Sequence, residues 1–272
     1  LSISNFESLE TYIRLKKHPQ NHIKIDTGMH RQGFLPDDVF KLLKLLKRFK
    51  LTPSGVYTHF ASAKDAAYPT YTLEQFAKFK KILGLFSKAG FKNLIRHASA
   101  SGGTLLYPQT HLDMVRIGMS LYGYWPSPES QIAKRKRQIT LEPALSWRTF
   151  ISEIKKIKKG SYVGYDLTER VSRDSKIAVL PIGYWHGYDR GLSSVGKVLV
   201  RGRRAKVLGR VSMDMMVVDI TDIKGAKVGD KVTLIGKDKK EELWADELGL
   251  KIGTSQYEFL TRINPLIKRF VV

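Results

Sequence analysis

The sequence of 272 residues contains no cysteine. This absence excludes disulfides, cysteine nucleophiles and thiolate metal sites, and it is compatible with a reducing compartment. There is also no run of 18 or more apolar residues, and the first ten residues have neither the charged nor the apolar region of a signal peptide. We therefore expect a cytoplasmic protein with no membrane partner, and we predict no bound metal.

Acidic residues are few, because 25 Asp and Glu stand against 47 Lys and Arg, for a formal net charge of +22. A balance of this sign favours a polyanionic partner. The densest basic runs, at residues 41–50, 134–137, 155–159 and 201–206, lack the aromatic and glycine patterns of known nucleic-acid-binding modules. We therefore expect a solvated basic surface with weak, non-specific affinity, and no specific nucleic-acid partner.

Residues 1–137 alternate helical and strand patterns. Strands are expected at residues 22–26, 55–60, 94–99 and 113–118, and Asn5 is placed to cap a first helix. After Pro36, one helical face is predicted to carry the apolar residues Val39, Phe40, Leu42, Leu43, Leu46 and Phe49. Repeated βα units indicate a parallel sheet covered by helices. Because a complete (β/α)8 barrel takes about 250 residues, we expect roughly its C-terminal half here, with the first strands upstream of residue 1.

From residue 141 the sequence consists of apolar or alternating runs separated by glycine and charged turns. The runs are SWRTFISEI, KIAVLPIGY, KVLVRG, AKVLGRVS, MMVVDI and KVTLIG, with short helices expected near residues 245–250 and 256–263. The predicted fold class is α/β: a partial (β/α)8 TIM-type barrel in residues 1–137, followed by a C-terminal all-β domain in residues 138–272.

Polar side chains follow the ends of four successive predicted strands, where a parallel barrel places its active site. They are Lys24, Asp26 and Arg31, then His59, then Ser101, then Arg116. Taken singly, each group has an ordinary structural interpretation. The alternation of Ile23 and Ile25 with polar neighbours also fits a half-exposed strand, and an isolated histidine in a strand is often a satisfied core residue.

Taken together, the motifs resemble those of the alanine racemase family, which uses pyridoxal 5'-phosphate (PLP) on a (β/α)8 barrel with a C-terminal β domain. The matching motifs are HIKIDTGMHRQGF, THFASA, HASASGGTLLYP, MVRIGMSLYGYWP, LEPALSW, VGYD, LPIGYWHGYDRG, GRVSMDMM and YEFLTRI. The resemblance extends over nearly the whole chain.

The resemblance implies a set of PLP-binding residues. Arg116 corresponds to the arginine facing the ring nitrogen; a guanidinium is always charged and only donates, so it leaves that nitrogen unprotonated. His59 corresponds to the histidine packed against the ring. The implied phosphate cradle consists of Ser101, Gly118, Met119 and Tyr257. Arg31 is implied to hold the phenolic oxygen of PLP, and Lys24 is a candidate for carbamylation, which would turn a buried cation into an anion that holds Arg31.

The resemblance also implies the catalytic and substrate-binding residues. Tyr165, contributed by the neighbouring subunit of a homodimer with shared active sites, corresponds to the base for the α-proton of L-alanine. Met213 and Asp214 correspond to a Met-Asp pair near the substrate carboxylate across the same interface, and Tyr184 to a tyrosine at the entrance. Arg31 is also implied to be a substrate-binding residue. On spacing alone, Tyr165 would be an ordinary turn residue and Met213 a core residue.

One element of the family pattern is missing from the sequence. No segment matches the Lys-Ala-Asn-Ala-Tyr-Gly-type motif, whose lysine forms the Schiff base with PLP and serves as the second base. We therefore expect an N-terminally truncated alanine racemase, inactive alone, from an enzyme that supplies D-alanine for peptidoglycan. A broad-specificity or serine racemase, a non-catalytic remnant that binds PLP or a partner, and a basic nucleic-acid-associated protein are the alternatives. A smaller departure is His186, where the family usually has Asp before the glycine.

Overall fold

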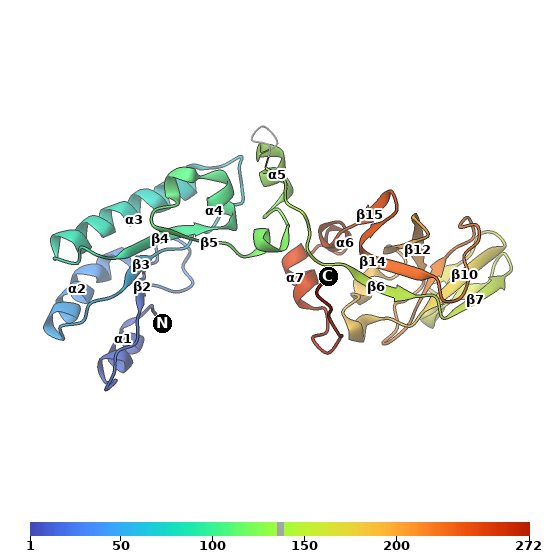
Figure 1. Ribbon diagram of the computed structural model, residues 1–272, viewed down its shortest axis with the longest axis horizontal. Coiled ribbons are helices and arrows are strands. Elements are labelled where there is room, and N and C mark those ends of the chain that lie inside the picture. Colours follow the sequence, from blue (N-terminus) through green and yellow to red (C-terminus); the bar gives the residue numbers. More distant parts are fainter. Residues whose placement is uncertain (135–138) are drawn as a thin grey trace. The chain divides into compact units, whose positions relative to one another are not determined.

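The computed structural model describes residues 1–134 and 139–272, which divide into two compact units (Figure 1). Unit 1 comprises Leu1–Glu142 and unit 2 comprises Pro143–Val272. The expected domain boundary between residues 137 and 138, and the basic residues 135–137, lie outside the described residues.

The strands of unit 1 form one parallel sheet whose order in space is their order in sequence. They are β1 (Ser2–Ile3), β2 (His22–Lys24), β3 (Gly55–Tyr57), β4 (Ile95–Ala100) and β5 (Met114–Arg116). Strand β3 is shorter than the predicted 55–60, because the carbonyl of Thr58 turns to a side-chain donor, Arg116, instead of a neighbouring strand. Sequential order with right-handed crossovers places the connecting helices on one face of the sheet.

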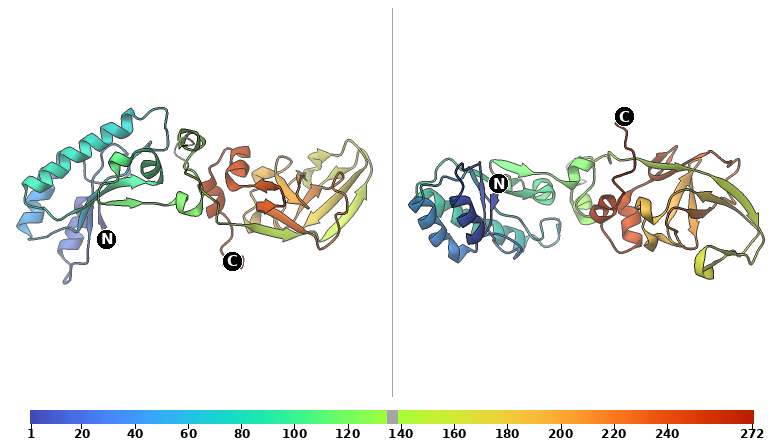
Figure 2. Two further views of the ribbon diagram at one scale, coloured as in Figure 1. Left: turned by 45° about the horizontal axis from the view of Figure 1, so that its top comes forward. Right: turned by 90° about the horizontal axis from the view of Figure 1, so that it is seen from below.

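The helices of unit 1 begin where the sequence supplies a start signal. They are α1 (Phe6–Ile13), α2 (Val39–Arg48), α3 (Thr70–Lys88), α4 (Ser101–Leu106) and α5 (Pro128–Lys134), with 3-10 turns η1 (Pro36–Asp38), η2 (Pro108–Thr110) and η3 (Met119–Tyr122). The Asn5 side chain accepts the Ser8 N–H at 2.8 Å and so caps α1 as predicted. Helix α3 runs alongside β4 (Figures 1 and 2).

One apolar core joins the helices of unit 1 to the sheet. Leu9 of α1, Leu42 of α2, Phe79 of α3 and Ile23 of β2 are all fully buried in it. The predicted buried face of α2 was wrong for two residues: Phe40 is 63% exposed and Phe49 is 42% exposed. Phe40 directly follows the buried Val39, and a step of about 100° along the helix turns its ring to the solvent side.

Unit 2 is built mainly from antiparallel strands. They are β6 (Trp147–Phe150), β7 (Glu153–Ile157), β8 (Tyr162–Val163), β9 (Glu169–Arg170), β10 (Ser175–Leu180), β11 (Lys197–Val200), β12 (Arg203–Leu208), β13 (Met216–Asp219), β14 (Lys231–Asp238) and β15 (Glu241–Leu243). The main sheet has the order β15-β14-β11-β12-β13-β10-β7, β6 also pairs with β14, and β8 pairs with β9. Each of these pairs is antiparallel.

Short helical segments complete unit 2. They are η5 (Tyr165–Leu167), η6 (Tyr184–His186), η7 (Arg190–Leu192), α6 (Ala245–Lys251) and α7 (Gln256–Thr261). The predicted fold class, a partial parallel α/β barrel followed by a β domain, is confirmed. Within residues 1–134 and 139–272, no helix has both the length and the apolar character needed to cross a membrane. The same residues contain no cluster of His, Asp and Glu suited to a metal ion.

Candidate active site

Arg116, the last residue of β5, is the centre of a polar cluster at the carboxyl ends of the unit 1 strands. Its Nη1 lies 2.6 Å from His97 Nδ1, and its Nη2 lies 3.1 Å from His59 Nδ1. Nη2 also donates to the carbonyl oxygens of Thr58 at 2.8 Å and Ala98 at 3.1 Å. All four partners are uncharged acceptors. Burial accordingly lowers the pKa of Arg116 from its usual value, although a guanidinium remains protonated in proteins.

The Arg116 contact determines the tautomer of His97. Because a guanidinium only donates, Nδ1 of His97 must accept, which leaves its proton on Nε2. That Nε2 lies 2.6 Å from His22 Nδ1, so His97 donates in turn to His22. The Tyr57 ring stacks on His97 with centroids 4.8 Å apart and planes 4° apart. Burial, followed by the charge of Arg116 and the neighbouring His22, lowers the pKa of His97 to about 3.

His59, on the segment after β3, is held neutral in the same way. Burial, then the positive charges of Arg116, Arg31 and Lys24, lowers the pKa of His59 to about 4. Its Nδ1 accepts from Arg116 as well. The structure therefore brings His59 and Arg116 together, as the sequence predicted.

Asp26 organises the loop that carries Arg31. Its Oδ1 accepts the backbone N–H groups of residues 28, 29 and 30 at 2.9–3.1 Å, and its Oδ2 accepts that of Arg31 at 3.2 Å. Burial alone would raise the pKa of Asp26, but the backbone hydrogen bonds outweigh it and lower the pKa. Gly33 is required where the loop returns, because a Cβ there would lie 2.6 Å from the Asp26 nitrogen and its φ is +128°.

Lys24 is buried, with 6% of its surface exposed, and its Nζ donates to Gln32 Oε1 at 3.3 Å. Burial is the largest cause that lowers the pKa of Lys24, and the positive charges of Arg31 and Arg116 lower it further against the opposing effect of Asp26. A lysine whose pKa is lowered has a larger neutral fraction, and the neutral amine is the nucleophilic form.

Ser101 lies beside Arg116, because its neighbour Ala100 pairs with Arg116 across β4 and β5. Its buried Oγ accepts the N–H of Gly118 at 3.0 Å and that of Ser120 at 3.4 Å. Met119 begins the η3 turn in the same segment and is 9% exposed. The predicted cradle residues of unit 1 therefore come together at the ends of β4 and β5.

Three predicted residues of unit 2 line one open pocket of about 520 Å³: Tyr165, Tyr184 and Met213. The pocket is also lined by Asp166, Arg190, Arg210, Val211 and Ser212. Tyr165 is 68% exposed and Met213 is 57% exposed. Arg210 Nε and Asp166 Oδ2 lie 2.6 Å apart and form an ion pair. The Nε–H group of Arg210 does not meet the geometry of a hydrogen bond to this oxygen.

The backbone brings the two halves of this pocket together. The N–H of Tyr184 donates to the Ser212 carbonyl at 3.0 Å, and that of Trp185 donates to the Met213 carbonyl at 2.8 Å. This approach requires Gly183, because a Cβ there would lie 2.1 Å from the Ser212 oxygen. At His186, the departure from the family pattern, Nδ1 accepts the Gly183 N–H at 3.2 Å, so the imidazole caps the turn.

Tyr257, predicted to contact phosphate, lies on α7 and is not among the residues that line this pocket. It is 39% exposed, and partial burial raises its pKa. The structure therefore does not bring Tyr257 to the other predicted site residues of its own unit.

The sequence analysis missed several residues of both clusters. His97, His22 and Tyr57 build the support of Arg116, although His97 and His22 both stand in motifs that resemble the family. Polar side chains inside apolar strand segments were the available signal. Arg190 and Arg210 of the unit 2 pocket stand next to predicted motif residues and carried no distinguishing pattern.

Comparisons with known proteins show the family of this chain. Residues 1–126 match the family model of the alanine racemase N-terminal domain, and residues 144–271 match that of the alanine racemase C-terminal domain. An alanine racemase of Leptospira interrogans is 43% identical over 257 residues, covering 93% of this chain and 66% of the relative. One from Methanococcus maripaludis is 40% identical over 258 residues, covering 94% of this chain and 68% of the relative.

Solved structures give the same result. The alanine racemase of Streptomyces lavendulae matches with a TM-score of 0.89 at 30% identity, over 97% of this chain and 70% of that chain. The alanine racemase of Bacillus anthracis with bound L-Ala-P matches with a TM-score of 0.86 at 34% identity, over 97% and 68%. The chain has the fold of a racemase of this type, with a partial parallel α/β barrel in unit 1 and an antiparallel β domain in unit 2. It belongs to the alanine racemase family, and it spans 66% of the length of the Leptospira relative.

Because His97 and His59 are neutral in the folded chain, we expect the free energy of unfolding of unit 1 to fall in acid. His97 and His59 have folded-state pKa values of about 3 and 4, below the ordinary 6.5, so between those values the unfolded chain binds more protons. Their contribution to the free energy of unfolding is therefore complete above pH 6.5 and is lost as the pH falls toward 4, by up to about 1.4 kcal/mol per pH unit for each imidazole. Urea unfolding between pH 7.5 and 4.5 measures the slope.

A His97→Gln variant is expected to be less stable at neutral pH and to show a shallower slope. His18→Gln, at an exposed histidine, is the control and should keep the slope of the unmodified chain. An unchanged slope in His97→Gln would contradict the assignment.

Proposed function

We propose that this chain serves the PLP-dependent interconversion of L- and D-alanine. The observation that carries the proposal is the Arg116 cluster, in which a buried guanidinium stands at a strand end beside two neutral imidazoles, His59 and His97. Family membership supports the same reaction. When bound, PLP supplies the electron sink that makes the α-proton of an amino acid removable. The residues of this chain would bind, orient and move protons.

Arg116 is suited to donate a hydrogen bond to the ring nitrogen of PLP. Its described hydrogen bonds use Nη1 and Nη2, and within residues 1–134 and 139–272 no acceptor is bonded to its Nε. A guanidinium cannot give up its proton, so a ring nitrogen that accepts from it stays unprotonated. This favours simple proton exchange over reactions that need a stronger electron sink. His59, held neutral, is proposed to pack against the ring.

Phosphate binding is assigned to the segment that joins Ser101 to Gly118 and Met119. A hydroxyl and backbone N–H groups at a loop are typical anion ligands. At Gly118, a Cβ would have no heavy atom within 4 Å, so space for a group exists beside this backbone. Tyr257 belongs to the same proposal on family resemblance alone.

Lys24 and Arg31 are proposed to act as a pair. The lowered pKa of Lys24 supports reaction of its neutral amine with CO₂, and the resulting carbamate would be an anion that holds Arg31. Arg31 would then bind the phenolic oxygen of the cofactor and the substrate carboxylate. The nearby carboxylate of Asp26 already accepts four backbone N–H groups. We therefore propose the carbamate of Lys24, and not Asp26, as the anionic partner of Arg31.

Tyr165 is the proposed base for the α-proton of L-alanine, with Met213 near the substrate carboxylate and Tyr184 at the entrance. These side chains are well exposed on unit 2. A phenol acting as a base needs a site that excludes water. We therefore propose a homodimer in which unit 2 of one copy completes the site of the other.

The sequence carries no match to the family's PLP-lysine motif. We propose that these 272 residues alone do not racemise alanine, and that the lysine is supplied by a segment outside them. Supply of D-alanine for peptidoglycan in the cytoplasm is the proposed role of the active enzyme.

Loss of the Ser101 hydroxyl should weaken PLP binding. For Ser101→Ala, we expect the affinity of the 272-residue chain for PLP to fall about tenfold, because a hydrogen bond to a charged group contributes about 1.5–3 kcal/mol. Equilibrium dialysis measures it, with pyridoxal as the phosphate-free comparison. Ser87→Ala, on the exposed side of α3, is the control. Equal affinity in Ser101→Ala and the unmodified chain would count against the cradle.

Tyr165→Phe should affect one enantiomer more than the other. The chain is fused behind the first barrel strands of an alanine racemase that carry the lysine motif, with the unfused chain as the inactive reference. In D₂O, the initial rate of deuterium incorporation from L-alanine should fall by about 10² or more, since general base catalysis contributes on that order. The D-alanine rate should fall less. Tyr162→Phe, a nearby exposed tyrosine, is the control. Equal loss for both enantiomers would refute the assignment.

A further inference from the structure

The solvent side of α2 carries five cations and two aromatic rings and no acidic residue. We call these residues the basic face: Phe40, Lys41, Lys44, Lys47, Arg48, Phe49 and Lys50, all of which are exposed. The opposite side of the same helix is buried in the core of unit 1. The fold therefore accounts for the buried leucines of α2, and on the outer side Lys41 lies over the ring of Phe6.

Asp37 and Asp38 directly precede α2, and the side chains of Lys41 and Arg48 lie over the rings of Phe6 and Phe49, but among the described residues no cation of the basic face is in an ion pair. Among the described residues, unit 1 has one ion pair, Arg96–Asp113, whereas ten ion pairs lie in unit 2. Lys47 and Arg48 are in the last turn of α2, where cations favour the helix dipole. The helix dipole thus accounts for two of the five cations, and Arg48 also lies over the ring of Phe49, but neither explains the exposed ring of Phe40.

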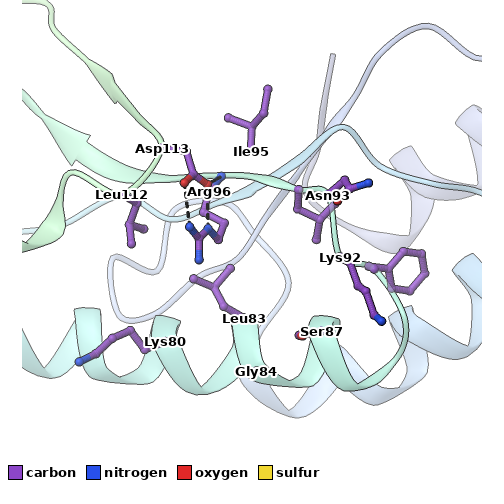
Figure 3. A pocket seen from close by; sticks show the side chains of 12 residues that line it. Lys80, Leu83, Gly84, Ser87, Lys92, Asn93, Ile95, Arg96, Leu112 and Asp113 are labelled. Carbon is purple, nitrogen blue, oxygen red and sulfur yellow. Dashed lines mark hydrogen bonds and ion pairs between the residues drawn. The ribbon is translucent and has the colours of Figure 1, made fainter.

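An open pocket of about 540 Å³ extends the basic face to the loop after α3. Lys47 and Lys50 line it from one side and Lys92 from the other, over an apolar base that includes Leu46, Leu51 and Phe91. None of its lining residues is acidic. The neighbouring pocket between α3 and β4 differs, because there Arg96 is already bonded to Asp113 at 2.7 Å (Figure 3). The first pocket is therefore the one suited to an anionic group.

We propose that the basic face binds an anionic phospholipid surface, with lipid phosphates at Lys47, Lys50 and Lys92 and the rings of Phe40 and Phe49 below the headgroups. Clusters of four to eight Lys and Arg on an amphipathic helix are typical of such binding. Exposed aromatic rings gain free energy at a lipid interface. Two exposed phenylalanine rings among the cations suit the apolar layer beneath lipid headgroups, so we propose a lipid surface, and nucleic acid is an outcome of the test.

This proposal concerns attachment at a surface and leaves the finding on membrane-spanning helices unchanged. The sequence-based expectation of no membrane partner rested on the absence of a long apolar run, which does not test surface binding. Helix α2 runs from the carboxyl end of β2 to the amino end of β3, so its last turn lies at the end of the sheet away from Arg116. Binding at the basic face would therefore leave the candidate active site open.

The test measures co-sedimentation of the 272-residue chain with vesicles of equal parts phosphatidylglycerol and phosphatidylcholine, and with pure phosphatidylcholine vesicles. We expect binding to the first only, weakening as salt rises. Lys44→Gln/Lys47→Gln should lower the partition coefficient about 25-fold, at about fivefold for each cation. Phe40→Ser/Phe49→Ser should lower it about tenfold or more. Circular dichroism checks that each variant is folded.

Lys240→Gln/Lys251→Gln is the matched control, since both lysines are exposed on unit 2 and the net charge changes equally. It should keep nearly the full affinity. Equal loss in this control would overturn the proposal, because net charge alone would then explain binding. Binding to random-sequence duplex DNA without binding to the phosphatidylglycerol vesicles would overturn it in favour of a nucleic acid.

Discussion

A buried cation that can only donate hydrogen bonds governs the arrangement of unit 1. Arg116 binds two imidazole nitrogens and two backbone carbonyls, from the ends of β3 and β4. Each acceptor is thereby fixed in orientation, and each histidine in tautomer. The hydrogen bond from His97 to His22 fixes the orientation and tautomer of His22, on β2, in the same way. The arrangement of polar side chains on β2, β4 and the segment after β3 therefore follows from the protonation chemistry of Arg116.

The candidate site holds more positive than negative charge. After burial, the charges of Arg31 and Arg116 lower the pKa of Lys24, and those of all three cations lower the pKa of His59. The carboxylate of Asp26 already accepts backbone N–H groups. Such mutual repulsion costs folding free energy in a site without ligand. An anionic ligand, with a phosphate, a phenolate or a carboxylate, relieves it. The electrostatics of unit 1 thus select the same ligand class that the family resemblance implies.

Sequence reasoning predicted the local arrangement where a local rule applies. Asn5 caps α1 through a contact three residues away, and Ser101 and Arg116 follow strands whose ends must share one edge of a parallel sheet. It failed where the partner is far away in the sequence or where the prediction needs precise geometry. His22 and His97 are 75 residues apart, and a pattern of apolar spacing does not reveal that their rings meet.

Sequence reasoning also fails to predict the direction of a side chain and the close contacts of the backbone, because both depend on the folded structure. Phe40 satisfies an apolar pattern by residue type, yet one step of the helix turns its ring to solvent. The need for glycine at position 183 is visible only once residue 212 is in place behind it. Periodicity fixes which face of a helix or strand is apolar to within about one residue, whereas contacts between segments depend on the folded backbone.

The two units differ in how far their exposed cations form ion pairs. Cations of unit 2, such as Arg173, Arg204 and Lys206, are placed opposite carboxylates on neighbouring strands and loops. Exposed pairs of this kind contribute little to stability, but they leave a surface with a weak field. On α2 and the two residues after it, five exposed cations form no ion pair among the described residues, and the exposed ring of Phe40 costs solvation that folding does not require. A surface that folding leaves unpaired in this way is better explained by something it binds than by the stability of the chain.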